Sequence, residues 1–397
     1  MRTTIPVVNG DALSAVRGLL KGLLEAGVVE ALLVPMETPA GTVTPALVAD
    51  PELLDAANPL APVMGLNAAR VAGHVSVREP RGRVGVVMRS CELRALVELI
   101  KLKQAGASDL VTISIDCLGT YDVPVFLEMQ ARGGVDMDAL LATAQTGDLA
   151  PQEGYAFRDA CQMCEKPHYE GADITLELFG ADLSAGIPVS LADEAAERLG
   201  LTPGVGADGT PADLRASLRT ADGTPADLGA ETAPLLRTEV LEKVVAARTQ
   251  VRDARLVEMR ERLAQEGVEG VFAACVRCHN CMTVCPICYC KTCLFKSPVF
   301  DHEPMLYMNW ARRKGAYRLP ADTVLFHLTR LNHMVLSCVG CGMCTSDCPA
   351  ELPVGRVFRA IGQQVQDTFE YEPGRSVEEP LPLVTFREDE WMEVGEE

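Results

Sequence analysis

The sequence predicts an α/β domain followed by a smaller, cysteine-rich domain. Strand-like and helix-like segments alternate from about residue 11 to residue 179, which is typical of a sheet covered by helices. Four cysteines lie in this first part, and the other eleven fall between Cys275 and Cys348. This uneven distribution indicates two domains with different chemistry.

The α/β prediction depends on individual segments. Asp11 can cap an amphipathic helix that runs to about Glu25, and Gly27 can end it. A second helix is expected over residues 91–104. Short apolar runs predict buried strands at residues 28–35, 83–88, 109–115 and 172–179.

The remaining segments suggest a linker, a long helix and a tail. The octapeptide ADGTPADL occurs at residues 207–214 and again at 221–228, and we assign it no chemistry. We expect an α/β domain at 1–199, a linker at 200–232, a long helix at 233–267, a cysteine-rich domain at 268–362 and an acidic tail at 363–397.

Composition excludes several classes of partner. The formal net charge is −19 and no long basic run is present, which argues against nucleic acid or anionic lipid. No apolar stretch is long enough to insert into a membrane and no secretory signal is visible, so we expect a cytoplasmic protein. Because cytosolic thiols stay reduced, the fifteen cysteines are expected to bind metal rather than to form disulfides.

Two cysteine runs carry the strongest signal. They are Cys275-x2-Cys278-x2-Cys281-x3-Cys285-Pro286 and Cys338-x2-Cys341-x2-Cys344-x3-Cys348-Pro349. Each matches the bacterial ferredoxin run, in which three thiolates hold one [4Fe–4S] cluster and the fourth reaches the other cluster. We therefore expect one cluster on Cys275, Cys278, Cys281 and Cys348, and another on Cys338, Cys341, Cys344 and Cys285. Zinc is the alternative, but it does not explain two full copies that each end in Cys-Pro.

A long insert separates these two runs. Residues 286–337 include the basic, aromatic segment NWARRKGAYRLP (309–320), which is either a docking surface or a solvated helix, and we favour the solvated helix. The insert also holds Cys288, Cys290 and Cys293, which neither cluster requires. These three could bind an extra metal with His302 or His333, line a docking surface, or pack as small apolar side chains.

The N-terminal cysteines form a weaker pattern. Cys91 and Cys117 each follow a predicted strand, at the sheet edge where α/β proteins usually bind ligands. Cys161 and Cys164 form a CxxC pair. Together they supply the four thiolates of a third [4Fe–4S] cluster. Two core cysteines plus a zinc or free-thiol pair fit the spacing equally well.

Several segments resemble one protein family. GVVMRSCELRALVEL, VTISIDC and CQMCEKPHYEGADITLELFG are similar to segments of the coenzyme F420 hydrogenase/dehydrogenase beta-subunit family. The similarity covers roughly residues 10–185, and the ferredoxin runs continue it to about residue 360. The order of the parts looks most like that of formate dehydrogenase members. The resemblance implies FAD in the N-terminal domain, the third cluster on the four N-terminal cysteines, and hydride exchange with coenzyme F420.

The chain departs from this family near the expected flavin site. Arg89-Ser90-Cys91-Glu92 stands where the family more often has Thr-Pro-Cys-Gln, and LELFGADL replaces a Gly-rich continuation. No GxGxxG fingerprint follows a strand. Candidates for flavin contacts are Asn67, Arg70, Arg89 and Ser90. Lys166 and His168 follow the CxxC pair and could tune the third cluster or face solvent.

These observations lead to one preferred function and two alternatives. The preferred function is an iron–sulfur flavoprotein electron-transfer subunit with three [4Fe–4S] clusters and FAD. It would form a hetero-oligomer with a catalytic subunit of the formate dehydrogenase alpha or hydrogenase type, and exchange hydride with coenzyme F420 or a similar acceptor. The first alternative is a flavin-free adaptor that links redox enzymes in a heterodisulfide-reductase-type assembly. The second is a zinc-stabilised scaffold.

Overall fold

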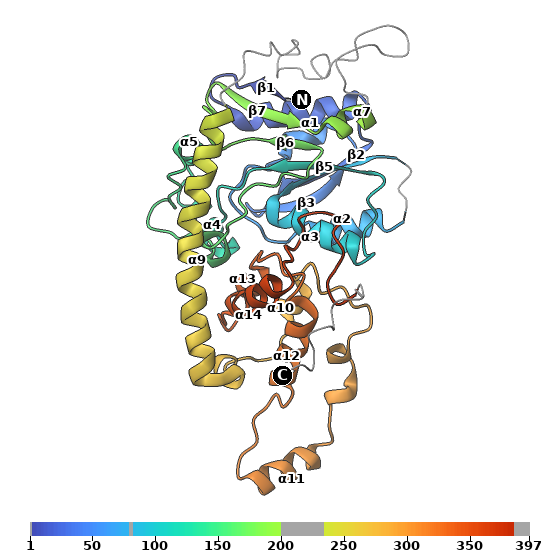
Figure 1. The fold of residues 1–397 in the computed structure, drawn as a ribbon, viewed down its shortest axis with the longest axis vertical. Coiled ribbons are helices and arrows are strands. Elements are labelled where there is room, and N and C mark those ends of the chain that lie inside the picture. Colours follow the sequence, from blue (N-terminus) through green and yellow to red (C-terminus); the bar gives the residue numbers. More distant parts are fainter. Residues whose placement is uncertain (1, 79–81, 200–233, 385–397) are drawn as a thin grey trace, which may run out of the picture.

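The computed structural model describes residues 2–78, 82–199 and 234–384. Its first domain is built on one seven-stranded mixed sheet of order β1-β7-β6-β5-β4-β2-β3 (Figure 1). The strands are β1 Arg2–Pro6, β2 Ala31–Glu37, β3 Val43–Val48, β4 Val84–Arg89, β5 Leu110–Ile115, β6 Ile174–Leu176 and β7 Gly186–Leu191. The inner strands β2, β4, β5 and β6 pair in parallel, while β3, β7 and β1 are antiparallel to their neighbours. This confirms the predicted α/β architecture.

The first helix follows the predicted capping. The backbone N–H of Ser14 donates to Asp11 Oδ1 over 2.9 Å at the start of α1, and Gly27 adopts a positive φ of 67° just beyond its end. The helices of this domain are α1 Ala12–Glu25, α2 Ala69–Ser76, α3 Ser90–Lys101, α4 Val123–Ala131, α5 Met137–Thr146, α6 Asp159–Gln162 and α7 Asp193–Leu199, with the short 3-10 helix η1 at Pro51–Ala56.

The buried apolar residues form two separate cores. One core contains α1, α4, α5 and one side of the sheet, through residues such as Leu20 and Phe126. The other contains α2 and α3, and it continues without a break into the cysteine-rich domain through Phe326 and Phe358. The two domains therefore share buried apolar surface, which stabilises their mutual arrangement.

The expected long helix is α9, Pro234–Val271, and it runs along both domains (Figure 1). Gly267 interrupts it with a φ of 68°. The tandem octapeptide, expected in the preceding linker, lies outside the described residues. The cysteine-rich domain contains α10 Asn280–Thr283, η2 Leu294–Lys296, η3 Pro298–Phe300, α11 Pro304–Lys314, α12 Thr323–Met334, α13 Met343–Ser346 and α14 Val354–Thr368.

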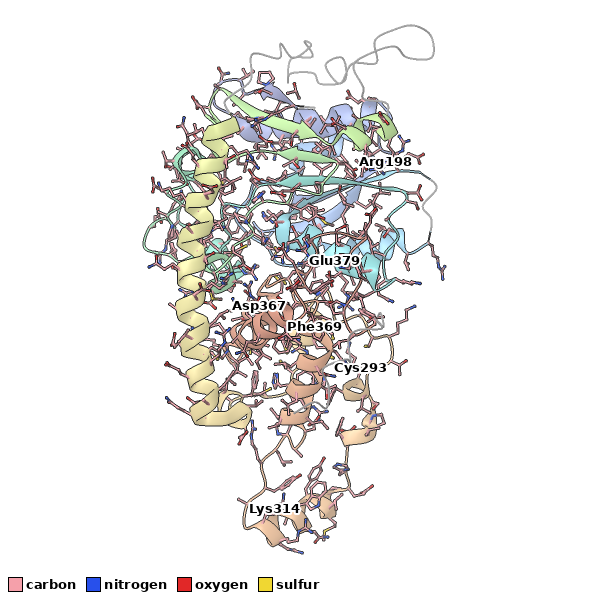
Figure 2. All side chains as sticks on the ribbon, in the orientation of Figure 1. Arg198, Cys293, Lys314, Asp367, Phe369 and Glu379 are labelled. Carbon is pink, nitrogen blue, oxygen red and sulfur yellow. The ribbon has the colours of Figure 1, made fainter. Side chains whose placement is uncertain are left out.

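The expected acidic tail begins too early. Residue 363 lies within α14, and the chain beyond this helix packs against α3. The Tyr371 hydroxyl and the Gly374 N–H both donate to Glu98 Oε1, over 2.6 and 2.8 Å, and Arg94 Nε donates to the Pro373 carbonyl over 3.0 Å. Figure 2 shows Glu379 in the same region. A buried acceptor on α3 thus fixes a segment whose composition alone suggests a solvated tail.

An ion pair attaches α9 to the sheet. The Asp116 carboxylate, 2% exposed, accepts from the Arg237 guanidinium and also from the backbone N–H groups of Leu178 and Phe179. Asp116→Ala would leave these donors without their acceptor, so we expect a loss of about 3–5 kcal/mol in the free energy of unfolding. Thermal unfolding should show this as a clear fall in Tm.

The matched control for Asp116→Ala is Asp148→Ala. Asp148 pairs with Lys243 near the same helix, but both side chains are largely exposed. An exposed pair contributes little, so Tm should stay close to that of the wild type. Equal Tm values for the two variants would show that the buried pair does not hold α9.

Candidate functional site

The four N-terminal cysteines come together at one end of the sheet. Strands β4 and β5 pair in parallel with Arg89 opposite Ile115, so Cys91 and Cys117 each lie two residues beyond this pair. The Cys117 N–H donates to the Pro167 carbonyl over 2.8 Å, which holds the loop of Cys161 and Cys164 beside the strand end. All four cysteines line one pocket of about 410 Å³. The parallel register thus explains how distant cysteines meet.

Charge in this pocket suits a thiolate-ligated iron–sulfur cluster, whose net charge is negative. Burial and the neighbouring Cys161 thiol raise the pKa of Cys117 to about 11, and burial raises the pKa of Cys91 well above its ordinary value. Thiolates therefore form here only with positive compensation, which iron provides. Basic side chains also line the pocket: Arg89, Arg158, Lys166 and Arg248. Four partly buried thiols in a pocket lined with basic side chains fit a [4Fe–4S] cluster.

A second group combines cysteines from both ferredoxin runs. Cys285 of the first run lines a pocket of about 660 Å³ with the first three cysteines of the second run, Cys338, Cys341 and Cys344. Burial raises the pKa of Cys341 to about 12, and Cys285 adds to this rise. The structure thus places together the four residues that the spacing predicts for one cluster, and this donor set fits a [4Fe–4S] group.

The third group comprises Cys275, Cys278, Cys281 and Cys348. Burial raises the pKa of Cys281 to about 11, and the other three thiols add to this rise, which places them nearby. The two runs also share a local conformation. Arg277 and His279 have φ of 55° and 67°, and Gly340 and Gly342, at the equivalent positions, both have 71°. The repeated sequence therefore forms a repeated loop.

The second group adjoins the N-terminal group. Cys341 lines both pockets. The guanidinium of Arg158, 2% exposed, lies between them and donates to the Cys341 carbonyl over 3.0 Å and to Ser346 Oγ over 2.9 Å. The twelve cysteines thus form three groups, of which the second and the N-terminal group share a wall.

Three buried side chains near the cysteines escaped the sequence analysis: Arg158, His327 and Arg330. Burial, with the nearby Arg330 and Arg318 cations, lowers the pKa of His327 to about 3, so its ring is neutral at neutral pH. Nearby thiolates raise the pKa of Arg158 and Arg330 despite their burial. Arg158 precedes the short helix α6, and His327 and Arg330 lie within α12. Isolated basic residues give no spacing signal, so sequence reasoning could not have found them.

The four flavin candidates lie in different surroundings. Arg89 and Ser90 line the pocket of the N-terminal cysteines, where Arg89 donates to the Ala61 carbonyl. Arg70 Nη1 donates to the Thr283 carbonyl over 2.6 Å, so it joins the two domains. Asn67 Nδ2 and Ser90 Oγ are buried without a hydrogen-bond partner among the described residues. A roomier pocket of about 1010 Å³ lies between α3 and α7, and none of the four lines it.

Lys166 and His168 lie in different surroundings. Lys166 lines the N-terminal cysteine pocket, and its Nζ pairs with Glu372 over 2.7 Å. His168 Nε2 lies 3.2 Å from Glu170 Oε1 and does not line that pocket. Only Lys166 is therefore placed to affect the N-terminal group.

The spare cysteines do not form a metal site in the described part of the chain. Among its residues, no group of three or more His, Cys, Asp or Glu is arranged to hold a single metal ion. Cys290 is exposed, and Cys293 Sγ lies 3.8 Å from Met282 Sδ. His302 packs against Trp310, and its ring centroid lies 5.2 Å from that of the indole. This arrangement gives the extra metal no support. It does not bear on the clusters, whose irons keep their thiolates apart.

The basic, aromatic segment of the insert forms a projecting helix. Helix α11 has no buried residues, and Lys314 lies at the far end of the molecule (Figures 1 and 2). The rings of Tyr307, Trp310 and Tyr317 pack on one another and on His302, and Lys314 Nζ lies 5.1 Å from the Tyr317 ring centroid. The helix covers this segment only as far as Lys314, and Arg318 beyond it donates to the Phe272 and Ala273 carbonyls. An exposed helix fits a docking surface as well as the favoured solvated helix, so both stay predictions. Among the described residues, no helix combines the length and apolar character needed to cross a membrane.

A match to a known family agrees with the two ferredoxin-type cysteine groups. A family model described as a 4Fe-4S dicluster domain matches residues 271–352. The F420-dependent formate dehydrogenase subunit beta of Methanocaldococcus jannaschii is 22% identical over 76% of this chain and 75% of its own. The F420-dependent formate dehydrogenase 1 subunit beta of Methanococcus maripaludis is 24% identical over 94% of both chains. A solved F420-reducing [NiFe] hydrogenase complex from Methanosarcina barkeri aligns with a TM-score of 0.38 and 13% identity, over 65% of this chain and 92% of that one.

Proposed function

We propose that this chain, a homologue of the beta subunits of F420-dependent formate dehydrogenases, is an iron–sulfur electron-transfer subunit of a formate dehydrogenase- or hydrogenase-type complex. It would join a catalytic subunit and connect it to coenzyme F420 or a similar hydride acceptor. The observation that carries the proposal is the arrangement of twelve cysteines in three groups of four. Three adjacent [4Fe–4S] clusters would form a path for single electrons through the chain.

The clusters supply one-electron chemistry when bound, and the chain determines their surroundings. The N-terminal group has Cys91, Cys117, Cys161 and Cys164 as ligands; the other two take four cysteines each from the ferredoxin-type runs. The buried Arg158 lines the pocket of the N-terminal group, and its guanidinium donates to the carbonyl of Cys341 in the second group. This contact holds the two domains together where the groups meet, and the cation offsets the negative charge of thiolate ligands.

The flavin belongs to the proposal on the strength of the family resemblance of the sequence. FAD is the group that would couple single electrons to a hydride. Of the four residues expected to contact it, Arg89 and Ser90 line the pocket of the N-terminal cysteines, and we derive no step through the flavin. Asn67 Nδ2 and Ser90 Oγ are buried without a hydrogen-bond partner among the described residues, so they are available to a bound molecule.

Anaerobic purification with its native partners tests the proposal. We expect about twelve irons per chain, flavin after acid release, and F420 reduction by the complex with formate or H₂ as donor. About twelve irons without flavin would contradict hydride chemistry and favour the adaptor. Zinc in place of iron would favour the scaffold, and about eight irons would contradict the N-terminal cluster.

A further inference from the structure

Helix α12, from the insert between the two cysteine runs, carries two buried polar side chains toward the third cysteine group. His327 is 2% exposed and Arg330 is 3% exposed. They lie three residues apart, so they share one face of the helix. Neither residue belongs to the ferredoxin-type runs, and nothing in those runs requires this helix.

Both side chains contact cysteine sulfurs. His327 Nε2 lies 3.3 Å from Cys275 Sγ, and Arg330 Nη1 donates to Cys281 Sγ over 3.0 Å. Arg330 Nη2 also donates to the Cys281 carbonyl over 2.9 Å. In the described part of the chain, these are the only cysteine sulfurs within hydrogen-bond distance of a side-chain nitrogen, and His327 donates in the tautomer that carries its proton on Nε2. In the N-terminal group the nearest counterpart there is the Thr120 hydroxyl, 3.2 Å from Cys161 Sγ. Arg330 also lines the pocket of the second group, but its hydrogen bond goes to the third group.

Aromatic packing fixes both donors. The His327 ring stacks on Phe272 with centroids 3.7 Å apart and planes 5° apart. The Arg330 guanidinium lies 5.5 Å from the Phe326 ring centroid and 5.1 Å from that of Phe358. Such packing removes rotamer freedom, so the donors are held in place whether or not a ligand is bound.

The charge of Arg330 lacks an acidic partner. Within the described residues it forms no salt bridge with a carboxylate, although it is almost fully buried. Its surroundings are instead the thiols Cys281, Cys285, Cys344 and Cys288. Because a buried unpaired cation is costly, its position indicates a negatively charged neighbour, which a thiolate-ligated cluster provides.

We propose that α12 raises the reduction potential of the cluster on Cys275, Cys278, Cys281 and Cys348 above that of the cluster on Cys285, Cys338, Cys341 and Cys344. Reduction makes a cluster more negative, and N–H donors to its sulfurs and a nearby cation favour the more negative state. Arg330 and His327 are positioning residues that act through the cysteines. The inference rests on the proposed clusters. It assigns helix α12 of the insert the role of adjusting a reduction potential.

The test is a redox titration of the anaerobic holo-complex, followed by EPR. Arg330→Met should decrease the reduced-to-oxidised ratio of one cluster about tenfold at its wild-type midpoint. His327→Gln should shift the same signal in the same direction by a smaller factor, and Arg330→Lys, which keeps the charge, should fall between Arg330→Met and the wild type. Cys338→Ala identifies the signal of the other cluster by its loss.

Matched controls lie on the same insert. His333→Gln changes an exposed histidine of α12, and Arg313→Met changes an exposed arginine of α11; neither should move a midpoint. The proposal is overturned if iron is retained and midpoints are unchanged in Arg330→Met or, should that variant lose iron, in Arg330→Lys and His327→Gln. A wild-type chain that lacks one ferredoxin-type signal would instead contradict the proposed function.

Discussion

Cys91→Ala should leave the chain with about eight irons instead of about twelve and abolish electron transfer to the hydride acceptor. Cys91 is the second residue of α3, which follows β4 directly, and it lines the pocket with the other three N-terminal cysteines. The substitution removes one of the four thiolate ligands, and we expect no water to replace it in this pocket. The eight ferredoxin-type cysteines are untouched, so their EPR signals should remain. Iron analysis and F420 reduction by the complex measure both effects.

A cysteine outside the three groups provides the control. Cys290 is exposed, so Cys290→Ser should keep the iron content and the activity of the wild type. If Cys91→Ala retained about twelve irons, Cys91 would not be a required cluster ligand, and the irons beyond the ferredoxin-type clusters would have other ligands.

The spacing of the cysteines predicts much of the site because each ferredoxin-type run supplies three ligands of one cluster from a single short loop. The cross-run pairing of Cys285 with the second run follows from the ferredoxin pattern, and the structure places these residues together. Cys91 and Cys117 each lie two residues beyond the end of a strand. They come together because β4 and β5 are parallel neighbours with Arg89 opposite Ile115. In both cases a short sequence pattern predicts which cysteines lie close together.

The remaining features depend on tertiary contacts that leave no local pattern. The edge strand β1 pairs with β7 from far along the chain, and its short sequence has no alternating apolar pattern to mark it. Residues after 368 read as a tail, yet Glu98 on α3 binds them. Arg330 reaches Cys281 from a helix 49 residues away. Sequence reasoning assigns such residues to surfaces, because charged side chains are seldom buried unless a partner compensates them.

The contact between the domains at Gly342 leads to the second large effect. Gly342 lies between Cys341 and Met343 with a φ of 71°, which favours glycine. A Cβ at this position would lie 2.2 Å from the Ala160 Cβ on α6, the short helix that carries Cys161. The cluster loop therefore approaches the N-terminal group only because this residue has no side chain.

Gly342→Ala should push the cluster loop away from α6 and disturb Cys341 and Cys344 together. Strain at a positive φ costs about 1–2 kcal/mol, and the steric clash adds to it. We expect a lower iron content, a fall in Tm and a large decrease in electron transfer between the second group and the N-terminal group. Gly315→Ala is the matched control, since Gly315 also has a positive φ of 79°, but a Cβ added there would have no atom within 4 Å.

A second substitution separates the clash from the backbone strain. Ala160→Gly removes the atom that the new Cβ would meet, so Gly342→Ala combined with Ala160→Gly should recover most of the iron content and electron transfer, while keeping the smaller loss of Tm seen for Gly315→Ala. Stopped-flow reduction of the N-terminal group by a reductant for the ferredoxin-type clusters measures the recovery. A double variant as slow as Gly342→Ala would mean that backbone strain, rather than contact with α6, displaces the loop. Recovery would instead show that the close approach of these two backbones sets the rate at which electrons cross between the domains.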